Sequence, residues 1–439
     1  MKEKIVLIGA GSAMFTRGLV ADIIRQDWEG ELASVDIDPD ALSVAERLTG
    51  KMVEAKNAPL KLSAATDRRE VLKDASVVIC TIGVGGRRAW EQDVFIPRKY
   101  GIYQPVGDSV MPGGTSRALR MIPAMVEIAE DVLDLAPEAL FFNYGNPMSA
   151  VCRAVRKATG ANITGLCHGV FGVGNHLATV LGVEPARIKY TALGINHLTW
   201  FTELRVDGQD AMPKLLAIAR ENLTKIDHGY LDAHFTWELA DLFGAFPAVG
   251  DSHITEFFPH MFAKKGSYYG KTLGVDAYSF ENTIKHGDKI FAEMREQALS
   301  PAPLPDDYFN QMSGEHEQVI EIIESIRHDA GKVYSVNLPN HGQISNLPDE
   351  AVVEAPAIAD GRGLRHIAQP PMDAGIVGTL ASRFQWVETV VDAALQGSRE
   401  KLIQALLIDG AVDSVSTAKL LADDLLKTHK KYLPQFNDK

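Results

Sequence analysis

The sequence predicts an α/β protein of two domains, with a doubly wound parallel sheet in its N-terminal part. Three observations support this prediction. Short apolar runs alternate with helix-like stretches in the first 200 residues, a glycine-rich turn follows the first of these runs, and helical patterns, aromatic residues and histidines become more frequent over 213–330. We therefore expect one domain over residues 1–200 and a second, mixed α+β and helix-rich domain over residues 201–439.

The predicted strands are short runs of mostly apolar residues. They occupy residues 4–8, 34–37, 76–82, 140–144 and 163–167. Unbroken apolar runs are typical of strands that are buried on both faces, and helices between successive strands make those strands parallel through right-handed connections. Helical patterns fill the intervals at 12–25 and 41–55. In the second half, apolar residues spaced by three or four predict a helix over 373–395.

Composition and charge limit the classes of partner. The 439 residues include 44 Lys and Arg against 57 Asp and Glu, which gives a formal net charge of −13. This balance argues against nucleic acid or an anionic membrane as the main partner and leaves a small-molecule substrate. No apolar stretch approaches the roughly 18 residues of a membrane span, and the N-terminal run is too short for a signal peptide. Three cysteines, an odd and sparse count, predict a cytoplasmic protein without disulfides.

The glycine-rich turn predicts a dinucleotide site. Gly9 and Gly11 follow the first strand and Ser12 opens the next helix, so the backbone can approach a pyrophosphate at the helix N-terminus. Asp36 ends the second strand, where a carboxylate accepts hydrogen bonds from a ribose and favours NAD over NADP. Met14 replaces the third small residue of the dinucleotide fingerprint, so a doubly wound fold without a nucleotide is the alternative. Residues at neighbouring strand ends that would flank the cofactor are Thr81, Gly83 and Asn143.

A cysteine and a histidine form a candidate metal site. Cys167 ends the fifth strand, within Cys167-His168-Gly169, and His197 follows later in the chain. A thiolate together with an imidazole suits a borderline divalent metal such as Mn²⁺, Co²⁺, Ni²⁺ or Fe²⁺, with open positions for substrate oxygens. From the spacing alone, the alternative is a buried thiol and a hydrogen-bonded core histidine.

Several motifs occur in a fixed order along the chain. They are Gly9-Ala10-Gly11-Ser12, the segment Asp108-Ser109-Val110-Met111-Pro112-Gly113-Gly114 leading into Arg117-Ala118-Leu119-Arg120, Asn143-Tyr144-Gly145-Asn146-Pro147, Leu166-Cys167-His168-Gly169, Gly194-Ile195-Asn196-His197, and Asn346-Leu347-Pro348 with Val353-Glu354. This ordered set resembles the family 4 glycoside hydrolases over nearly the whole chain. The resemblance implies a Rossmann-like N-terminal domain and the cofactors NAD and Mn²⁺ or another divalent metal.

The chemistry of that family combines oxidation with elimination. Hydride passes from sugar C3 to NAD⁺, the metal polarises the new ketone, a base takes the C2 proton, and the glycosidic oxygen leaves before water adds and hydride returns. The resemblance assigns Cys167 and His197 as metal ligands. It places Asn146 against substrate or cofactor, and His168 against the substrate or in the role of the acid.

The base is open between two residues. Phosphoglycoside members of the family use a tyrosine, and the corresponding stretch here, 247–258, contains none. Asp251 and His253 are the groups in that stretch that can take a proton. We favour Asp251 slightly, with the other residue orienting it.

The Cys-His pair favours an unphosphorylated sugar. Members that act on 6-phosphosugars usually carry Cys-Asn or Cys-Asp, whereas Cys167-His168-Gly169 resembles the α-glucuronidases and α-galacturonidases. A uronide needs a cation for its carboxylate, and the candidates are Arg88 and Arg117, with Arg87 beside them. The alternatives are an α-glucosidase or α-galactosidase of the same family and, in another class, a simple NAD-dependent sugar or hydroxy-acid dehydrogenase. The resemblance also implies a homodimer or homotetramer, with substrate, metal and oligomer contacts in the second domain.

Overall fold

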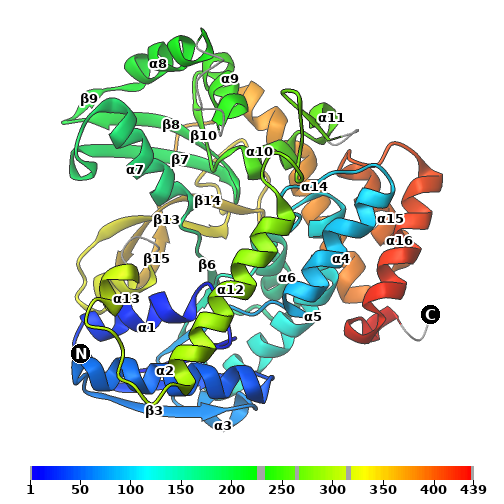
Figure 1. Ribbon diagram of the computed structural model, residues 1–439. Coiled ribbons are helices and arrows are strands. Elements are labelled where there is room, and N and C mark those ends of the chain that lie inside the picture. Colours follow the sequence, from blue (N-terminus) through cyan, green and yellow to red (C-terminus); the bar gives the residue numbers. More distant parts are fainter. Residues whose placement is uncertain (1, 225–232, 263–265, 313–317, 437–439) are drawn as a thin grey trace.

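The computed structural model describes residues 2–224, 233–262, 266–312 and 318–436 (Figure 1). The strands are β1 (Lys2–Ile8), β2 (Glu29–Val35), β3 (Leu60–Ala65), β4 (Val77–Cys80), β5 (Leu140–Asn143), β6 (Ile163–Gly165), β7 (Ile188–Ile195), β8 (Leu198–Val206), β9 (Gln209–Asp210), β10 (Phe246–Ala248), β11 (Ser267–Tyr268), β12 (Lys271–Thr272), β13 (Lys332–Pro339), β14 (Val352–Asp360) and β15 (Gly363–His366). The α-helices are α1 (Thr16–Arg25), α2 (Pro39–Lys56), α3 (Arg69–Leu72), α4 (Gly86–Lys99), α5 (Met111–Leu135), α6 (Met148–Thr159), α7 (Gly169–Leu181), α8 (Met212–Thr224), α9 (His234–Phe243), α10 (Asp251–Phe257), α11 (Pro259–Phe262), α12 (Phe280–Leu299), α13 (Val319–Arg327), α14 (Ala374–Gln396), α15 (Arg399–Ile408) and α16 (Val415–His429).

One mixed sheet of 13 strands forms the frame of the molecule. Its main path runs β10-β8-β7-β14-β13-β6-β5-β4-β1-β2-β3, with β9 beside β8 and β15 beside β14. The strands from β6 to β3 on this path are parallel, and Ile8 pairs with Cys80, Cys80 with Asn143, and Asn143 with Gly165. Their carboxyl ends therefore align along one edge, where ligands bind in doubly wound sheets.

Helices cover both faces of the parallel strands. Ile5 and Leu7 of β1 point into a core shared with α1, α2 and α13, whereas Val6 and Ile8 point into a core shared with α5, α6 and α14. This alternation is expected for a strand that is buried on both faces. The predicted α/β class, the parallel N-terminal sheet and the helix over 373–395, which is α14, are confirmed.

The second half of the chain extends the same sheet with antiparallel strands. β13 and β14 lie between β6 and β7, and Glu354 of β14 pairs with Gly194 of β7. β7 and β8 form a hairpin whose turn consists of Asn196 and His197. The sheet therefore continues across the predicted boundary at residue 200, which falls inside β8.

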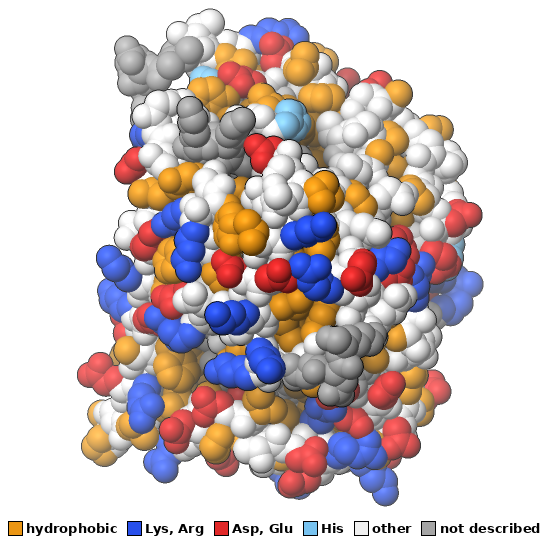
Figure 2. Space-filling view, turned by 90° about the vertical axis from the view of Figure 1, so that its right-hand side faces the viewer, with side chains coloured by type: hydrophobic (Ala, Val, Ile, Leu, Met, Phe, Trp, Pro, Cys, Tyr) orange, Lys and Arg blue, Asp and Glu red, His pale blue; other side chains and the backbone are white. Residues whose placement is uncertain are grey.

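Charges of both signs are mixed on the surface. On the face shown in Figure 2, Lys and Arg side chains lie among Asp and Glu side chains, with apolar groups between them. Among the described helices, none is both long and apolar enough to cross a bilayer. The net negative charge is thus spread through a mixed surface on this face.

Candidate functional site

Close backbone packing shapes the glycine-rich turn after β1. Gly9 has φ +93°, and a Cβ at this position would lie 2.8 Å from the backbone nitrogen of Ile82. α1 begins at Thr16, later than the predicted start at residue 12, and Ser12 lies in the turn, where its Oγ accepts a hydrogen bond from the Phe15 N–H at 3.4 Å. Only glycine fits position 9 without strain, and the turn lies directly against the end of β4.

Asp36 braces this turn from just beyond the end of β2. Its Oδ2 accepts a hydrogen bond from the Gly11 N–H at 2.8 Å, and its Oδ1 accepts one from the Asp38 N–H at 3.0 Å. A Cβ on Gly11 would lie 2.6 Å from the Cβ of Ala41 and 2.7 Å from Asp36 Oδ2, so a larger residue would force a shift here as well. Each carboxylate oxygen keeps a second acceptor position for a ligand hydroxyl.

The side chains at the carboxyl ends of β4 and β5 make different contacts. Thr81 Oγ1 donates to the Gly9 carbonyl at 3.0 Å, which ties the end of β4, and Gly83 after it, to the glycine-rich turn. Asn143 is 0% exposed; its Nδ2 donates to the Gly145 carbonyl and its Oδ1 accepts from the Gly145 N–H, both at 2.9 Å. The Asn143 amide is therefore buried and shapes the turn after β5, and the predicted position of Asn143 beside the cofactor stays a prediction.

Three side chains converge near the carboxyl end of β6. Ligand atoms of Asp108, His197 and His253 all lie within 4.8 Å of one another. His197 occupies the β7–β8 turn with φ +67°, His253 lies on α10, and Asp108 lies shortly before α5. The two imidazole rings have centroids 4.3 Å apart and planes inclined by 81°. Of these three residues, Asp108 was not predicted as a site residue.

Short hydrogen bonds join this cluster to the turn that contains Asn146. Ser109 Oγ donates to Asp108 Oδ1 at 2.7 Å and lies 2.7 Å from His197 Nδ1. Asn146 Nδ2 donates to Asp108 Oδ2 at 2.9 Å. The Oδ1 of Asn146 is buried and has no hydrogen-bond partner among the described residues. Asn146 thus lies beside the cluster with an acceptor available for a ligand.

Burial and mutual charge set the protonation of the cluster. Burial, followed by the charge of His253, lowers the pKa of His197 to about 3. Burial also lowers the pKa of His253. Burial alone would raise the pKa of Asp108, but His197, His253 and Arg117 outweigh it and lower that pKa. At neutral pH the cluster therefore offers a carboxylate and two neutral imidazoles, the protonation states that bind divalent metals.

Cys167 and His168 connect β6 to α7. Cys167 is half-buried, and its Sγ accepts a hydrogen bond from the Gly169 N–H at 3.4 Å. His168 is exposed and close enough to contribute, after burial, to the lowered pKa of His197 and His253. Cys167 is not among the three residues whose ligand atoms lie within 4.8 Å of one another. The structure therefore brings His197 into the tightest ligand group and leaves Cys167 outside it.

Asp251 is enclosed by donors from α9 and from Tyr268. Its carboxylate is 0% exposed and accepts hydrogen bonds from the N–H groups of Phe235 and Thr236, both at 2.8 Å, and from the Thr236 hydroxyl. Tyr268 donates a further bond at 2.5 Å. Burial raises the pKa of Asp251, but the carboxylate caps α9 and does not face the cluster. We therefore now prefer His253 to Asp251 as the candidate base, because only His253 is in the ligand group, and the role of each residue stays a prediction.

Arg117, on α5, is a half-buried cation beside the cluster. Its Nε donates to the Asn146 carbonyl at 3.0 Å, and its guanidinium lies 5.7 Å from the centroid of the Trp90 ring. Its Nη2 lies 3.5 Å from the position that a Cβ on Gly83 would occupy. Within the described ranges, the two Nη atoms have no hydrogen-bond partner. The free end of this cation therefore lies between the glycine-rich segment after β4 and Asp108.

Arg88 lies in a different environment. Its side chain is 61% exposed and forms ion pairs with Glu91 at 2.8 Å and with Asp288 at 2.6 Å. Arg87 shares the carboxylate of Asp288, at 2.6 Å. The charge of Arg88 is therefore exposed to solvent and paired with two carboxylates, which favours Arg117 over Arg88 as the candidate substrate contact.

Glu354 supports the histidine turn from the neighbouring strand and was not predicted as a site residue. Its Oε2 accepts a hydrogen bond from Thr199 Oγ1 at 2.7 Å and one from Asn196 Nδ2 at 3.3 Å, on the two sides of His197. Burial raises the pKa of Glu354 to about 7. The Val353-Glu354 motif was the only sign of this residue in the sequence. A single sequence does not show that Glu354 contacts Thr199, 155 positions earlier.

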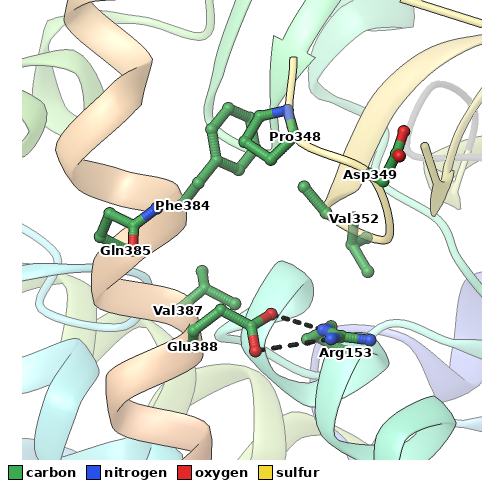
Figure 3. A pocket seen from close by; sticks show the side chains of 9 residues that line it. Arg153, Pro348, Asp349, Val352, Phe384, Gln385, Val387 and Glu388 are labelled. Carbon is green, nitrogen blue, oxygen red and sulfur yellow. Dashed lines mark hydrogen bonds and ion pairs between the residues drawn. The ribbon is translucent and has the colours of Figure 1, made fainter. Parts of the chain in front are cut away.

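Two cavities lie near α14, and only one adjoins the cluster. The pocket in Figure 3 lies between α14 and the segment before β14, where Arg153 and Glu388 form an ion pair at 2.5 Å. None of the predicted site residues lines this pocket. The smaller second cavity is lined by residues that include Ser109, Pro147, Ser149, Asn196 and Trp386.

Comparison with known proteins agrees with the order of the motifs. The family described as "Family 4 glycosyl hydrolase" matches residues 4–183, and the C-terminal domain of that family matches residues 192–412. An α-glucosidase of Erwinia rhapontici is 31% identical, with 99% of both chains covered. An α-galacturonidase of Bacillus subtilis is 32% identical, with 97% of both chains covered. A 6-phospho-α-glucosidase from gut microorganisms, solved with NAD and Mn²⁺, shares the fold with a TM-score of 0.83 at 21% identity over 99% of both chains.

Proposed function

Because the chain belongs to family 4 of the glycosyl hydrolases, we propose that this glycosidase hydrolyses α-D-uronides, a glucuronide or a galacturonide, with NAD and Mn²⁺ or another divalent metal as cofactors. The observation that carries the substrate proposal is the half-buried guanidinium of Arg117, whose Nη atoms have no partner among the described residues. The α-galacturonidase that is 32% identical supports the same substrate class.

The position of Arg117 fits the carboxylate of a uronide. Its guanidinium lies between Gly83, on the cofactor side, and Asn146, which contacts Asp108 on the metal side. A sugar that reacts with both cofactors must occupy the space between them. An arginine in this space can bind the carboxylate at sugar C5 through two parallel hydrogen bonds, which a neutral hydroxymethyl group cannot match.

The residues present fit both cofactors. The turn over 9–12 offers backbone N–H groups to a pyrophosphate, and Asp36 offers acceptors to a ribose, with Thr81 and Gly83 beside them. Cys167 and His197 would hold the metal. Asp108 adds a carboxylate within reach of His197, and His253 lies beside both as the proposed base. This mixture of nitrogen, oxygen and sulfur donors suits Mn²⁺, Fe²⁺, Co²⁺ or Ni²⁺.

The side chains around the sugar have distinct roles in the proposed reaction. When bound, NAD supplies reversible hydride transfer at sugar C3 and the metal supplies Lewis acidity at the resulting ketone. His253 is neutral at pH 7, because burial lowers its pKa, so it can accept the C2 proton. His168, exposed at the start of α7, donates a proton to the leaving oxygen or binds the sugar. Asn146 and Arg117 orient the ring.

Two other activities are compatible with part of this site. The 31% identical α-glucosidase supports a neutral α-hexoside as the substrate within the same family. A simple NAD-dependent sugar or hydroxy-acid dehydrogenase would use the glycine-rich turn without the metal cluster.

We further propose that the enzyme is cytoplasmic and forms a homodimer or homotetramer. Light scattering of the purified protein would test the oligomeric state.

Proton NMR of the reaction in D₂O separates these activities. The purified protein would be incubated with NAD⁺, Mn²⁺ and dithiothreitol and given, in turn, an α-glucuronide, an α-galacturonide, an α-glucoside and an α-galactoside. We expect free uronic acid with deuterium at C2 and no net NADH. Faster hydrolysis of a neutral hexoside would replace the uronide by that sugar. An oxidised sugar with stoichiometric NADH would make the protein a dehydrogenase.

A further inference from the structure

Ser109 lies between the carboxylate and the imidazole of the candidate metal cluster. Its side chain is 7% exposed, and its Oγ is 2.7 Å from Asp108 Oδ1 and 2.7 Å from His197 Nδ1. A hydroxyl has one proton, so it can donate to only one of these neighbours and must accept from the other. The direction of this chain decides which nitrogen of His197 carries a proton.

The surroundings of Asp108 settle the direction. A carboxylate is an acceptor only, and Asn146 already donates to its Oδ2 at 2.9 Å. If Ser109 donated to His197 instead, an oxygen lone pair of Ser109 would face Asp108 Oδ1 at 2.7 Å, which is repulsive. The hydroxyl proton therefore lies toward Asp108, and the proton between Ser109 and His197 belongs to Nδ1 of the histidine.

We propose that Ser109 is a positioning residue that holds His197 as its Nδ1–H tautomer, so that Nε2 presents its lone pair to the metal. This inference rests on the proposed function, because it assumes that His197 binds a metal. Metal-binding histidines commonly donate their other ring N–H to a carboxylate or carbonyl, which fixes the tautomer and the ring orientation. Here a serine hydroxyl connects the histidine to the carboxylate of Asp108.

The geometry of the hairpin turn makes this contact important. His197 has φ +67°, and Glu354 holds Asn196 and Thr199 on both sides of it, so the backbone of the turn is fixed. The imidazole can still rotate about its own side-chain bonds. The hydrogen bond to Ser109 and the perpendicular ring of His253 are the contacts that set its orientation.

A matched pair of serine variants tests the proposal without turnover. Ser109→Ala removes the hydroxyl, and Ser149→Ala is the control, because Ser149 lines the same cavity and its Oγ has no hydrogen-bond partner among the described residues. Free Mn²⁺ would be measured by electron paramagnetic resonance during titration of each protein. We expect Ser109→Ala to bind Mn²⁺ about 10- to 100-fold more weakly, with unchanged NAD affinity and melting temperature, and Ser149→Ala to match the wild type.

The tautomer itself can be read from the ¹⁵N shifts of histidine-labelled protein without metal. The proposal requires protonated Nδ1 and unprotonated Nε2 at His197 in the wild type, and loss of this preference in Ser109→Ala. A protonated Nε2 in the wild type, or unchanged Mn²⁺ affinity in a folded Ser109→Ala variant, would overturn it. If Ser109→Ala does not fold, the wild-type tautomer alone decides. A wild type with the Nδ1–H tautomer but no Mn²⁺ binding would instead overturn the proposed metal-dependent function.

Discussion

Asp251 and His253 are two residues apart on α10, yet their side chains meet opposite surroundings. Asp251 points back to cap α9, where every neighbour is a donor, whereas His253 faces Asp108 and His197. A carboxylate that accepts several hydrogen bonds stabilises the fold, and an imidazole in an open ligand group is available for chemistry. These contacts predict that Asp251 contributes to stability and that His253, in the proposed reaction, contributes to catalysis.

The amide variants of these two residues should show this separation. Asp251→Asn turns one of the two carboxylate oxygens into an NH2 donor that faces the N–H group of either Phe235 or Thr236, which costs about 1–3 kcal/mol for each buried group left without a partner. We expect a clearly lower melting temperature. His253→Asn should keep the melting temperature and lose roughly 10²- to 10⁴-fold in turnover. An Asp251→Asn protein that is as stable as the wild type but inactive would return the base to Asp251.

Arg117 provides a test of substrate class at the level of one side chain. Arg117→Met keeps much of the side-chain volume and removes the charge. We expect kcat/KM for the preferred uronide to fall about 10- to 100-fold, as for a lost charge-assisted hydrogen bond, with a smaller change for a neutral hexoside. Arg88→Met is the control and should be unchanged for both sugars, since Arg88 is exposed and paired with Glu91 and Asp288. Equal losses for both sugars in Arg117→Met would assign Arg117 to the cofactor.

Sequence patterns predicted the motifs of the site better than the contacts within it. His197 and Asn146 were identified from their motifs; in the structure Asn146 donates directly to Asp108, and His197 is joined to Asp108 through Ser109. Asp108 and Ser109 were missed as site residues, because their importance comes from a histidine 88 positions away. Asp251 was favoured because a carboxylate is an obvious base, and its enclosure by α9 leaves no mark in the local sequence.

At the level of elements, β14 explains why a carboxyl group is buried next to the histidine turn. β14 lies between β13 and β7, and this pairing brings Glu354 to Asn196 and Thr199. A carboxyl group here is stable in its neutral form, which is why burial raises its pKa from 4.5 to about 7. The strand thus supports the hairpin with a group whose charge depends on pH.

The raised pKa of Glu354 predicts that the free energy of unfolding falls as pH rises. The folded protein holds the proton of Glu354 more tightly than the unfolded chain, so the contribution is complete below about pH 4.5 and is lost as pH rises toward 7. The full effect is at most roughly 3 kcal/mol. Urea titrations of wild type and Glu354→Gln from pH 4.5 to 8 would measure it. We expect the free energy of unfolding of the wild type to fall relative to that of Glu354→Gln as pH rises. A difference that does not change with pH would contradict the raised pKa of Glu354.

The elements that were predicted are those with a strong local pattern. Apolar runs predicted β1, β4, β5 and β6, and spacing by three or four predicted α14. β3 was missed because its sequence, Leu-Lys-Leu-Ser-Ala-Ala, is only partly apolar and lies at the edge of the sheet. The placement of β13 beside β6 could not be predicted, because it joins segments that are far apart in the chain.

For the whole molecule, removal of the metal should affect activity far more than fold. The ligand group lies at the sheet edge, whereas two large apolar cores hold the two faces of the sheet together. We expect a chelator to abolish hydrolysis and Mn²⁺ to restore it, while circular dichroism stays the same. Excess Mn²⁺ at about 100 times its dissociation constant should add only about 2.7 kcal/mol to the free energy of unfolding. Full activity after exhaustive chelation would remove the metal from the mechanism.

The continuity of the sheet also bears on how the protein is made on the ribosome. β6 ends at Gly165, but its neighbour β13 begins at Lys332. The edge of β6 therefore has no β13 to pair with until a much later part of the chain has been synthesised. At a synthesis rate of about 5–20 residues per second, this wait is roughly 10 to 30 seconds. An unpaired strand edge attracts other chains during that time. A nascent chain arrested at residue 330 should therefore recruit a holding chaperone, and the released full-length chain should not.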